Sequence, residues 1–291
     1  MRSFIVPASQ EIENIIGRKA KDHWRLFDSP AQALDYVESN CSKVDNWTAG
    51  PTNFYGHETR EDCARRTRGG DLERVAPSNA LLERFERFAF ETPRKGWRDD
   101  VTGSIANVPA YLAGQPTAMR RRVTNKDAGA PLAVIIDLAT SSKISADTIE
   151  KRGAAVLALV RLLSMRRPVE LWAGVFTGAG NNDRHCAAIF NKIETAPLDL
   201  ATAAYVLCSA GFPRRLLYSV AHESCGFVSH WPYRNHSTSR AHMDAICRAG
   251  FHHVTDALCI PAVHIEDDIA SNPQAWIERK LTELSPVDLA A

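Results

Sequence analysis

The sequence predicts an α/β fold, in which a doubly wound, mostly parallel sheet follows a helical and irregular N-terminal extension. The apolar run 132–136 is rich in β-branched residues, which is typical of a strand buried on both faces. From residue 131 onward, strand-like and helix-like segments alternate with short links, as in parallel sheets with right-handed crossovers. The polar linker 124–130 precedes this pattern. We therefore expect two regions, residues 1–130 and residues 131–291.

The composition is that of an ordinary globular protein, with 45% hydrophobic and 24% charged residues among 291. A formal net charge of +1 gives no general reason to expect binding to nucleic acid or acidic membranes. No signal peptide begins the sequence, and no apolar run approaches the roughly 20 residues that span a bilayer. The seven cysteines are scattered and odd in number. We expect a cytoplasmic protein with reduced, mostly buried thiols and no membrane contact.

The N-terminal extension is predicted to consist of helices and loops. Residues 1–40 are expected to be helical and peripheral, with Ser29 capping a helix that begins at Pro30. The aromatic segment 45–59 contains glycines and a proline. We interpret it as a loop that its aromatic side chains dock onto the core, with a ligand platform as the alternative.

Two further helices are predicted in this extension. Residues 58–70 indicate a highly charged helix that ends at a pair of glycines, and residues 77–92 an amphipathic helix capped by Ser78 or Asn79. The charged helix presents either a solvated surface or a phosphate-binding face. Its arginines are Arg60, Arg65, Arg66 and Arg68.

Three adjacent arginines, Arg120, Arg121 and Arg122, lie near the end of the Gly- and Pro-containing tract 96–123. Arginines that neutralise phosphates drive non-specific binding to nucleic acid. If the tract forms a strand, alternate side chains point to opposite faces and the cluster is divided. Nucleic-acid binding through these arginines is therefore an alternative function.

The second half is expected to supply the elements of the sheet. The predicted strands cover 132–137, 169–176, 186–193, 214–222 and 256–265. The predicted helices cover 145–165, 198–211, 241–254 and 272–284. Ser145 and Asn272 are predicted N-caps, and Pro273 stands at the first position of the last helix.

Asp137 stands at the predicted carboxyl end of the first strand, where ligands bind in open α/β sheets. The residues DLATS at 137–141 resemble the Asp-x-Ser-x-Ser signature of the von Willebrand factor type A domain. This resemblance implies a von Willebrand A/Rossmann-like fold with a metal-ion-dependent adhesion site. In that site, Thr195 aligns best with the later threonine of the family, and His222 or Glu223 stands in the place of its later acid.

The resemblance implies Mg²⁺ or another divalent cation bound by Asp137, Ser141, Thr195 and Glu223, since Mg²⁺ prefers oxygen ligands. Ala139 stands where the family has its first serine, so the site is degenerate. We favour the alternative that Asp137 and Ser141 satisfy backbone donors and cap the following helix.

The tract NVPAYLAGQPTAMRRR at 107–122, followed by the DLATSS strand, is similar to a family of uncharacterised, mostly phage-encoded proteins. This resemblance covers most of the chain. It implies a phage or mobile-element origin and supplies no activity.

Other motifs give little chemistry. Seven of the ten histidines fall between 222 and 264 beside three cysteines, but their spacing fits no compact zinc finger. The sequence contains no nucleophile elbow, phosphate-binding loop or dinucleotide fingerprint. The segment 227–240 is expected to be an exposed loop, in which Trp231, Tyr233 and Arg234 suit partner recognition.

We therefore predict a non-enzymatic protein-binding module that engages its partner around Asp137, Ser141 and Thr195. The resemblance to von Willebrand A domains implies an AAA+ ATPase or a phage assembly component as partner. A nucleic-acid-associated phage protein is the first alternative, and a metal-dependent enzyme is the third hypothesis.

Overall fold

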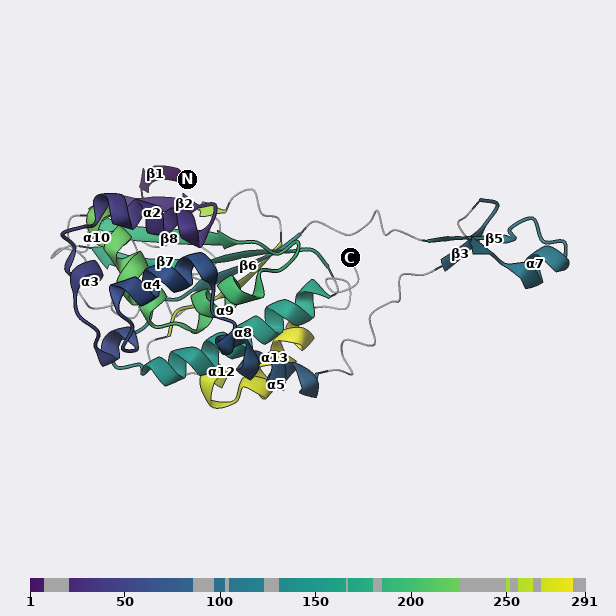
Figure 1. Cartoon of the computed structure of the whole chain (residues 1–291). Helices are drawn as coiled ribbons and strands as arrows, with labels where there is room; N and C mark the ends of the chain where they lie inside the picture. Colours follow the sequence, from purple (N-terminus) through teal and green to yellow (C-terminus); the bar gives the residue numbers. More distant parts are fainter. Residues whose placement is uncertain are drawn as a thin grey trace.

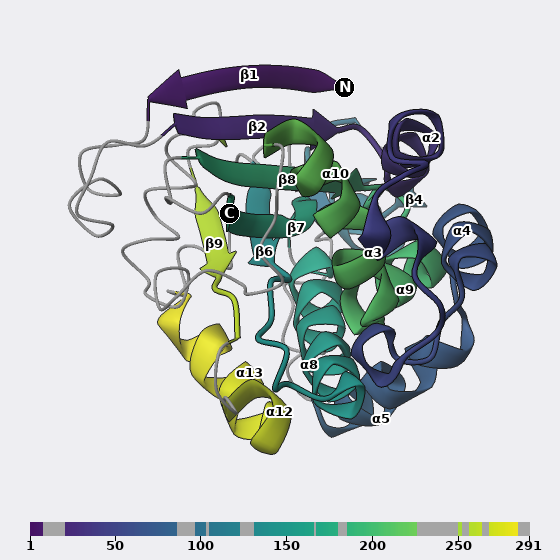
Figure 2. The ribbon, with the colours of Figure 1, turned by 90° about the vertical axis from the view of Figure 1, so that its left-hand side faces the viewer.

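A mixed six-stranded sheet forms the centre of the molecule (Figures 1 and 2). The computed structural model describes residues 1–7, 21–85, 97–102, 105–122, 131–165, 167–179, 185–225, 250–251, 256–263 and 268–284. The strands lie in the order β1-β2-β8-β7-β6-β9. Their bounds are β1 Arg2–Pro7, β2 Lys21–Phe27, β6 Leu132–Asp137, β7 Val169–Ala179, β8 His185–Ile193 and β9 Ala257–Ile260.

Most neighbouring strands are parallel, which agrees with the predicted α/β class. β6 pairs in parallel with both β7 and β9, and β2 pairs in parallel with β8. The pairs β7–β8 and β1–β2 are antiparallel. β7 ends at Ala179 and β8 begins at His185, so the connection is far shorter than the dozen residues that a parallel crossover needs. The direction of β8 follows from that short connection.

Helices pack against one face of the sheet, as Figure 2 shows for α8, α9 and α10. These elements are α2 Pro30–Asn40, α3 Asp45–Thr48, α4 Arg60–Gly69, α5 Ala76–Arg84, α8 Ala146–Ser164, α9 Leu200–Cys208, α10 Tyr218–Cys225, α12 Asp268–Ser271 and α13 Pro273–Glu283. Short 3-10 helices cover η1 Asn53–Tyr55 and η2 Glu73–Val75, and a π-helical segment covers η3 Phe212–Leu217.

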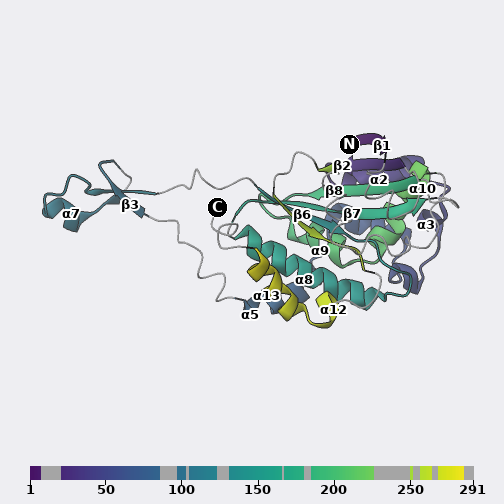
Figure 3. The same cartoon turned by 180° about the vertical axis from the view of Figure 1, so that it is seen from behind.

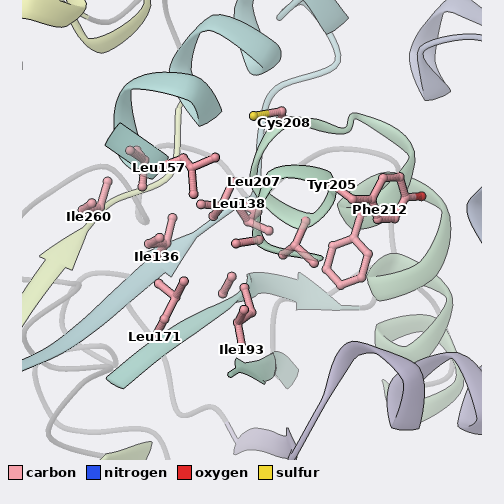
Figure 4. Close-up of a cluster of buried hydrophobic side chains, with 14 of the residues drawn as sticks. Ile136, Leu138, Leu157, Leu171, Ile193, Tyr205, Leu207, Cys208, Phe212 and Ile260 are labelled. Atoms are coloured by element: carbon pink, nitrogen blue, oxygen red, sulfur yellow. The ribbon is translucent and has the colours of Figure 1, made fainter. Parts of the chain in front are cut away.

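The main core lies between these helices and the sheet. Ile136 and Leu138 at the end of β6 point toward Leu157 of α8 and Leu207 of α9 (Figure 4). On the other face, Trp24, Trp172 and Phe190 pack their rings around Phe251. Both faces of β6 are therefore covered, which explains its uninterrupted apolar sequence.

Several predicted elements are confirmed. The Ser29, Ser145 and Asn272 side chains accept hydrogen bonds from the first-turn amides of α2, α8 and α13. The charged helix is α4, which begins with a capping box between Thr59 and Asp62. Each cap satisfies a backbone N–H that the helix cannot pair internally.

Other predictions are wrong. Residues 2–7 and 21–27 are strands of the main sheet and not helices. The predicted strand 214–222 is helical, in η3 and α10. The amphipathic helix α5 begins at Ala76 without a side-chain cap, and the rest of its predicted span lies outside the described residues. Of the predicted helix 241–254, only residues 250–251 are described.

The cysteines differ partly from the expected state. Cys41, Cys63 and Cys208 are free and buried, and burial raises the pKa of each thiol to about 12. Cys259 in β9 is disulfide-bonded, so the expectation of reduced thiols is wrong there. No helix in the described part of the chain has the length and apolarity needed to cross a membrane.

A small three-stranded sheet stands apart from the six-stranded sheet (Figures 1 and 3). Its strands are β3 Trp97–Asp100, β4 Ile105–Ala106 and β5 Met119–Arg122, in the order β3-β5-β4. The short helix α7, Val108–Leu112, connects β4 to β5. Arg120, Arg121 and Arg122 therefore lie in the central strand of this small sheet. We name residues 97–122, which include the small sheet and α7, the small unit.

Candidate functional site

The carboxyl end of β6 holds a completely buried carboxylate. Oδ1 of Asp137 accepts hydrogen bonds from the backbone N–H of Ala139 at 2.9 Å and of Phe176 at 3.3 Å. Oδ2 is buried and has no hydrogen-bond partner within the described residues. Burial raises the pKa of Asp137 to about 7, against the opposing effects of the two amides and of Arg152. Asp137 therefore ties β6 to β7 through the amide of Phe176, away from solvent.

The loop after β6 is held by a buried arginine. Arg214, in η3, donates to the carbonyls of Ser141 at 2.8 Å and Ile144 at 2.9 Å, and to Oγ1 of Thr140 at 3.2 Å. Its guanidinium also donates to the carbonyl of Phe54 and lies 4.5 Å from the centre of that ring. A fork of fixed donors of this kind immobilises the loop.

The next residue, Arg215, holds the aromatic segment 45–59. It donates to the carbonyls of Trp47, Ala49, Gly50 and Glu58 at distances from 2.7 to 3.3 Å. Its guanidinium lies 4.2 Å from the centre of the Tyr55 ring. Trp47 and Tyr55 are buried. The segment is thus docked on the core, as the sequence predicts in preference to a ligand platform. Arg215 is the residue that holds it.

The arginines of α4 are engaged with acidic side chains. Arg66 pairs with the buried Glu58 at 2.7 Å, and Arg68 pairs with Glu38 at 2.6 Å. Arg65 pairs with Asp62 at 3.3 Å. These ion pairs would compete with a phosphate for the guanidinium groups. They favour the interpretation of α4 as a solvated surface over that of a phosphate-binding face.

The structure does not bring the four predicted metal ligands together. Oγ1 of Thr195 donates to the carbonyl of Val169, at the start of β7, whereas Asp137 ends β6 beside Gly174 of β7. Because β8 runs antiparallel to β7, its carboxyl end lies at the edge of the sheet opposite Asp137. Thr195 is therefore at the wrong end of the sheet.

Glu223 and Ser141 are also committed elsewhere. Glu223 pairs with Arg25 of β2 at 3.0 Å and accepts a hydrogen bond from Tyr36. Oγ of Ser141 accepts from the amide of Lys143 at 3.3 Å in the turn before α8, so it satisfies a backbone donor, whereas the helix itself is capped by Ser145. Among the described residues, no three His, Cys, Asp or Glu side chains are grouped so that they could hold a metal ion. The residues Trp231, Tyr233 and Arg234 lie outside the described residues.

A second candidate site lies on the small unit. Val108, Tyr111 and Leu112 of α7 are 56%, 73% and 79% exposed, whereas Ala110 on the same helix is buried. Their spacing of i, i+3 and i+4 places all three on one face of the helix. Two more apolar side chains of this unit, Val101 and Ile105, are also exposed. We name the three α7 side chains the α7 patch.

Hydrogen bonds at both ends fix α7 on the small unit. Oδ1 of Asn107 caps the helix by accepting from the amide of Ala110 at 3.4 Å, and the amide of Asn107 donates to the carbonyl of Ala118. After the helix, Gly114 has a φ of +68°, and the amide of Gln115 donates to the carbonyl of Ala110. The α7 patch is therefore presented by a closed, hydrogen-bonded turn.

Residues 12–285 match the model of a protein family described as "Domain of unknown function (DUF7192)". The chain belongs to this family. No curated protein and no solved structure matches the chain. The family description names neither a von Willebrand A domain nor a phage, so both resemblances remain predictions. Function in this DUF7192 chain must be inferred from the sites themselves.

Sequence reasoning missed the α7 patch, although a signal was present. In the tract 107–122, Asn107 followed by Pro109 is a helix start, with a cap and a proline in the first turn. Such a start predicts α7 and places Val108, Tyr111 and Leu112 on one face. Their exposure could not be read from the sequence, because the same spacing is normally a buried face.

Proposed function

We propose that this chain is a non-enzymatic protein-binding module that binds its partner through the α7 patch. The exposed face of Val108, Tyr111 and Leu112 is the observation that carries the proposal. Large apolar side chains gathered on a small, hydrogen-bonded unit are typical of protein interaction sites. The proposed binding surface is therefore α7, in place of the surface around Asp137, Ser141 and Thr195 that the sequence predicts.

The state of Asp137 supports a binding role over catalysis. A general base or nucleophile must reach its substrate, and Asp137 has no exposed surface. In the described part of the chain, a groove of about 310 Å³ is lined by Glu38, Ser42, Trp47, Arg60, Glu61 and Ala64. This lining includes no histidine or cysteine that could pair with Ser42 in nucleophilic catalysis.

The von Willebrand A-like arrangement is part of the proposal. It is supported by β6, which has parallel neighbours on both sides and ends at Asp137 with a helix following its loop. An AAA+ ATPase or a phage assembly component, which that resemblance implies, is the partner class to test first. Such a partner would bind the small unit and leave the buried loop after β6 unchanged.

The decisive experiment compares two leucines of similar exposure. Leu112 is 79% exposed on α7 and Leu72 is 72% exposed before η2 on the main body. The full chain carrying Tyr111→Ser and Leu112→Ser is used to co-purify proteins from cells of the source organism, with wild type and Leu72→Ser in parallel. We expect a defined partner with wild type and Leu72→Ser and its loss with the double variant. Equal recovery by all three proteins contradicts the proposal.

Nucleic-acid binding is retained as the second candidate, because Arg120–Arg122 form a strand of the small unit. In the strand register, Asp99 is the backbone partner of Arg120. Binding of labelled DNA and RNA at two salt concentrations tests this candidate. A salt-dependent affinity that Arg120→Gln and Arg122→Gln reduce would favour it over protein binding.

A further inference from the structure

We infer that the partner of the α7 patch is an acidic protein segment, in which apolar anchor residues are flanked by aspartate or glutamate. This inference rests on the proposed protein-binding function and specifies its partner. It combines the apolar face of α7 with the formal net charge of the small unit.

The apolar part of the argument comes from exposure. Val108, Tyr111 and Leu112 each leave more than half of their surface in water. Burial of apolar surface is the main favourable contribution to most protein association, so three large apolar side chains can supply much of the free energy of a moderate complex. Because the hydrogen bonds around Asn107 and Gln115 already order α7, little ordering cost opposes this gain.

The charge part comes from the unequal distribution of ionised residues. The small unit carries four arginines and two aspartates, a formal charge of +2, whereas the whole chain carries +1. The rest of the chain therefore carries −1. One of the two aspartates, Asp100, accepts a hydrogen bond from the amide of Val101 at 2.7 Å. The net basic charge of the small unit, which carries α7, thus favours acidic groups in the partner.

Other occupants explain only part of the site. Phosphates of nucleic acid would pair with arginines but would leave Val108 and Leu112 in water. An interfacial membrane helix buries an extended apolar face, and α7 covers only Val108–Leu112. A second copy of the chain would offer a body with a formal charge of only −1. An acidic segment with apolar anchors satisfies both parts of the surface.

The test selects peptides on the full-length protein from a random peptide display library. We expect enriched sequences that combine aspartate or glutamate with leucine, isoleucine, phenylalanine or tryptophan. Their affinity, measured by fluorescence polarisation, should fall at least about tenfold with Tyr111→Ser plus Leu112→Ser and stay unchanged with Leu72→Ser. It should also fall several-fold when salt rises from about 50 to about 300 mM. Circular dichroism confirms that each variant is folded, and Leu112→Gln serves as a milder second variant.

Several outcomes would overturn the inference. These are enriched peptides without acidic residues, affinities that the α7 variants do not change, and concentration-dependent self-association that the same variants abolish. Preferential binding to DNA or to anionic phosphatidylserine vesicles over the peptides would do the same. If α7 variants lose the co-purified native partner while the peptides show no acidic preference, the inference fails and the proposed function stands. If the α7 variants still bind both the co-purified partner and the peptides, that result contradicts the inference and the proposed function alike.

Discussion

The carboxylate of Glu58 occupies the space that a side chain at position 211 would need. A Cβ atom added to Gly211 would overlap Oε2 of Glu58. That oxygen cannot move freely, because it accepts hydrogen bonds from Tyr205 at 3.2 Å and Ser209 at 3.0 Å, while Oε1 pairs with Arg66. Gly211 and Glu58 are thus coupled at the point where the N-terminal region meets the start of η3.

Gly211→Ala should therefore destabilise the fold by about 1–3 kcal/mol, the usual cost of overpacking a buried site. Urea unfolding followed by circular dichroism measures the change. Gly69→Ala is the matched control, because a Cβ at Gly69 meets no other atom within 4 Å. Equal midpoints for both variants would show that the Glu58 carboxylate can move aside.

Arg215→Lys should destabilise the protein even though it keeps the charge. Lysine cannot reproduce the planar fork that reaches four carbonyls of segment 45–59, and each buried carbonyl left unpaired costs about 1–3 kcal/mol. We expect a loss of at least about 2 kcal/mol in urea unfolding. Arg60→Lys, at a half-exposed arginine that pairs with Glu61, should change stability little. Similar losses for both would mean that charge alone matters at position 215.

Asp137 should make stability fall as pH rises toward and beyond neutral. Its folded-state pKa is about 7 and its ordinary value is 3.8, so between these values the folded protein holds a proton that the unfolded chain has lost. Each unit of difference corresponds to about 1.4 kcal/mol, so the wild type should lose roughly 2–3 kcal/mol between pH 5 and pH 8.

Asp137→Asn should remove this part of the pH dependence, because the amide remains neutral. Unfolding in urea at pH 5 and at pH 8 tests the expectation, and the variant should be the more stable protein at pH 8. Asp147→Asn, at an exposed carboxylate paired with Lys151, should keep the wild-type slope. A wild-type slope in Asp137→Asn would assign the pH dependence to other groups.

Magnesium should leave the protein unchanged. Thr195 lies at the edge of the sheet opposite Asp137, and Glu223 pairs with Arg25, so the four predicted ligands cannot share one ion. We expect the same melting temperature with millimolar Mg²⁺ and with a chelator, and no saturable heat in calorimetric titration. A saturable signal that Asp137→Ala removes would restore the metal site.

The sequence predicted best those elements whose local signals agreed with their tertiary roles. α8 and α13 each combine a capping side chain with helical apolar spacing, and β6 is uniformly apolar because both of its faces are buried. β1 and β2 are not predicted from the sequence, since β2 pairs with β8, which is distant in sequence, and β1 pairs with β2. Strand formation at such positions depends on tertiary context.

The segment 214–222 is helical, but its buried arginines hide the helical pattern of apolar residues in the sequence. Arg214 and Arg215 interrupt the apolar pattern, although both are buried in the folded protein. Pro213 at the first helical turn was the available signal. For the predicted metal ligands, the direction of β8 matters: the few residues between β7 and β8 indicate an antiparallel pair, which takes Thr195 to the end of the sheet opposite Asp137.

The pairing of β2 with β8 also determines the order in which the sheet can be assembled during synthesis. β2 begins at residue 21 and its partner at residue 185, so the first strands leave the ribosome long before the strand they pair with exists. Trp24 and Leu26, which are buried in the finished protein, have no sheet to join in that interval. β6 and β7, which are closer in sequence, can pair earlier. β2 can therefore join the main sheet only once β8 has emerged, and its apolar side chains must be protected from other contacts until then.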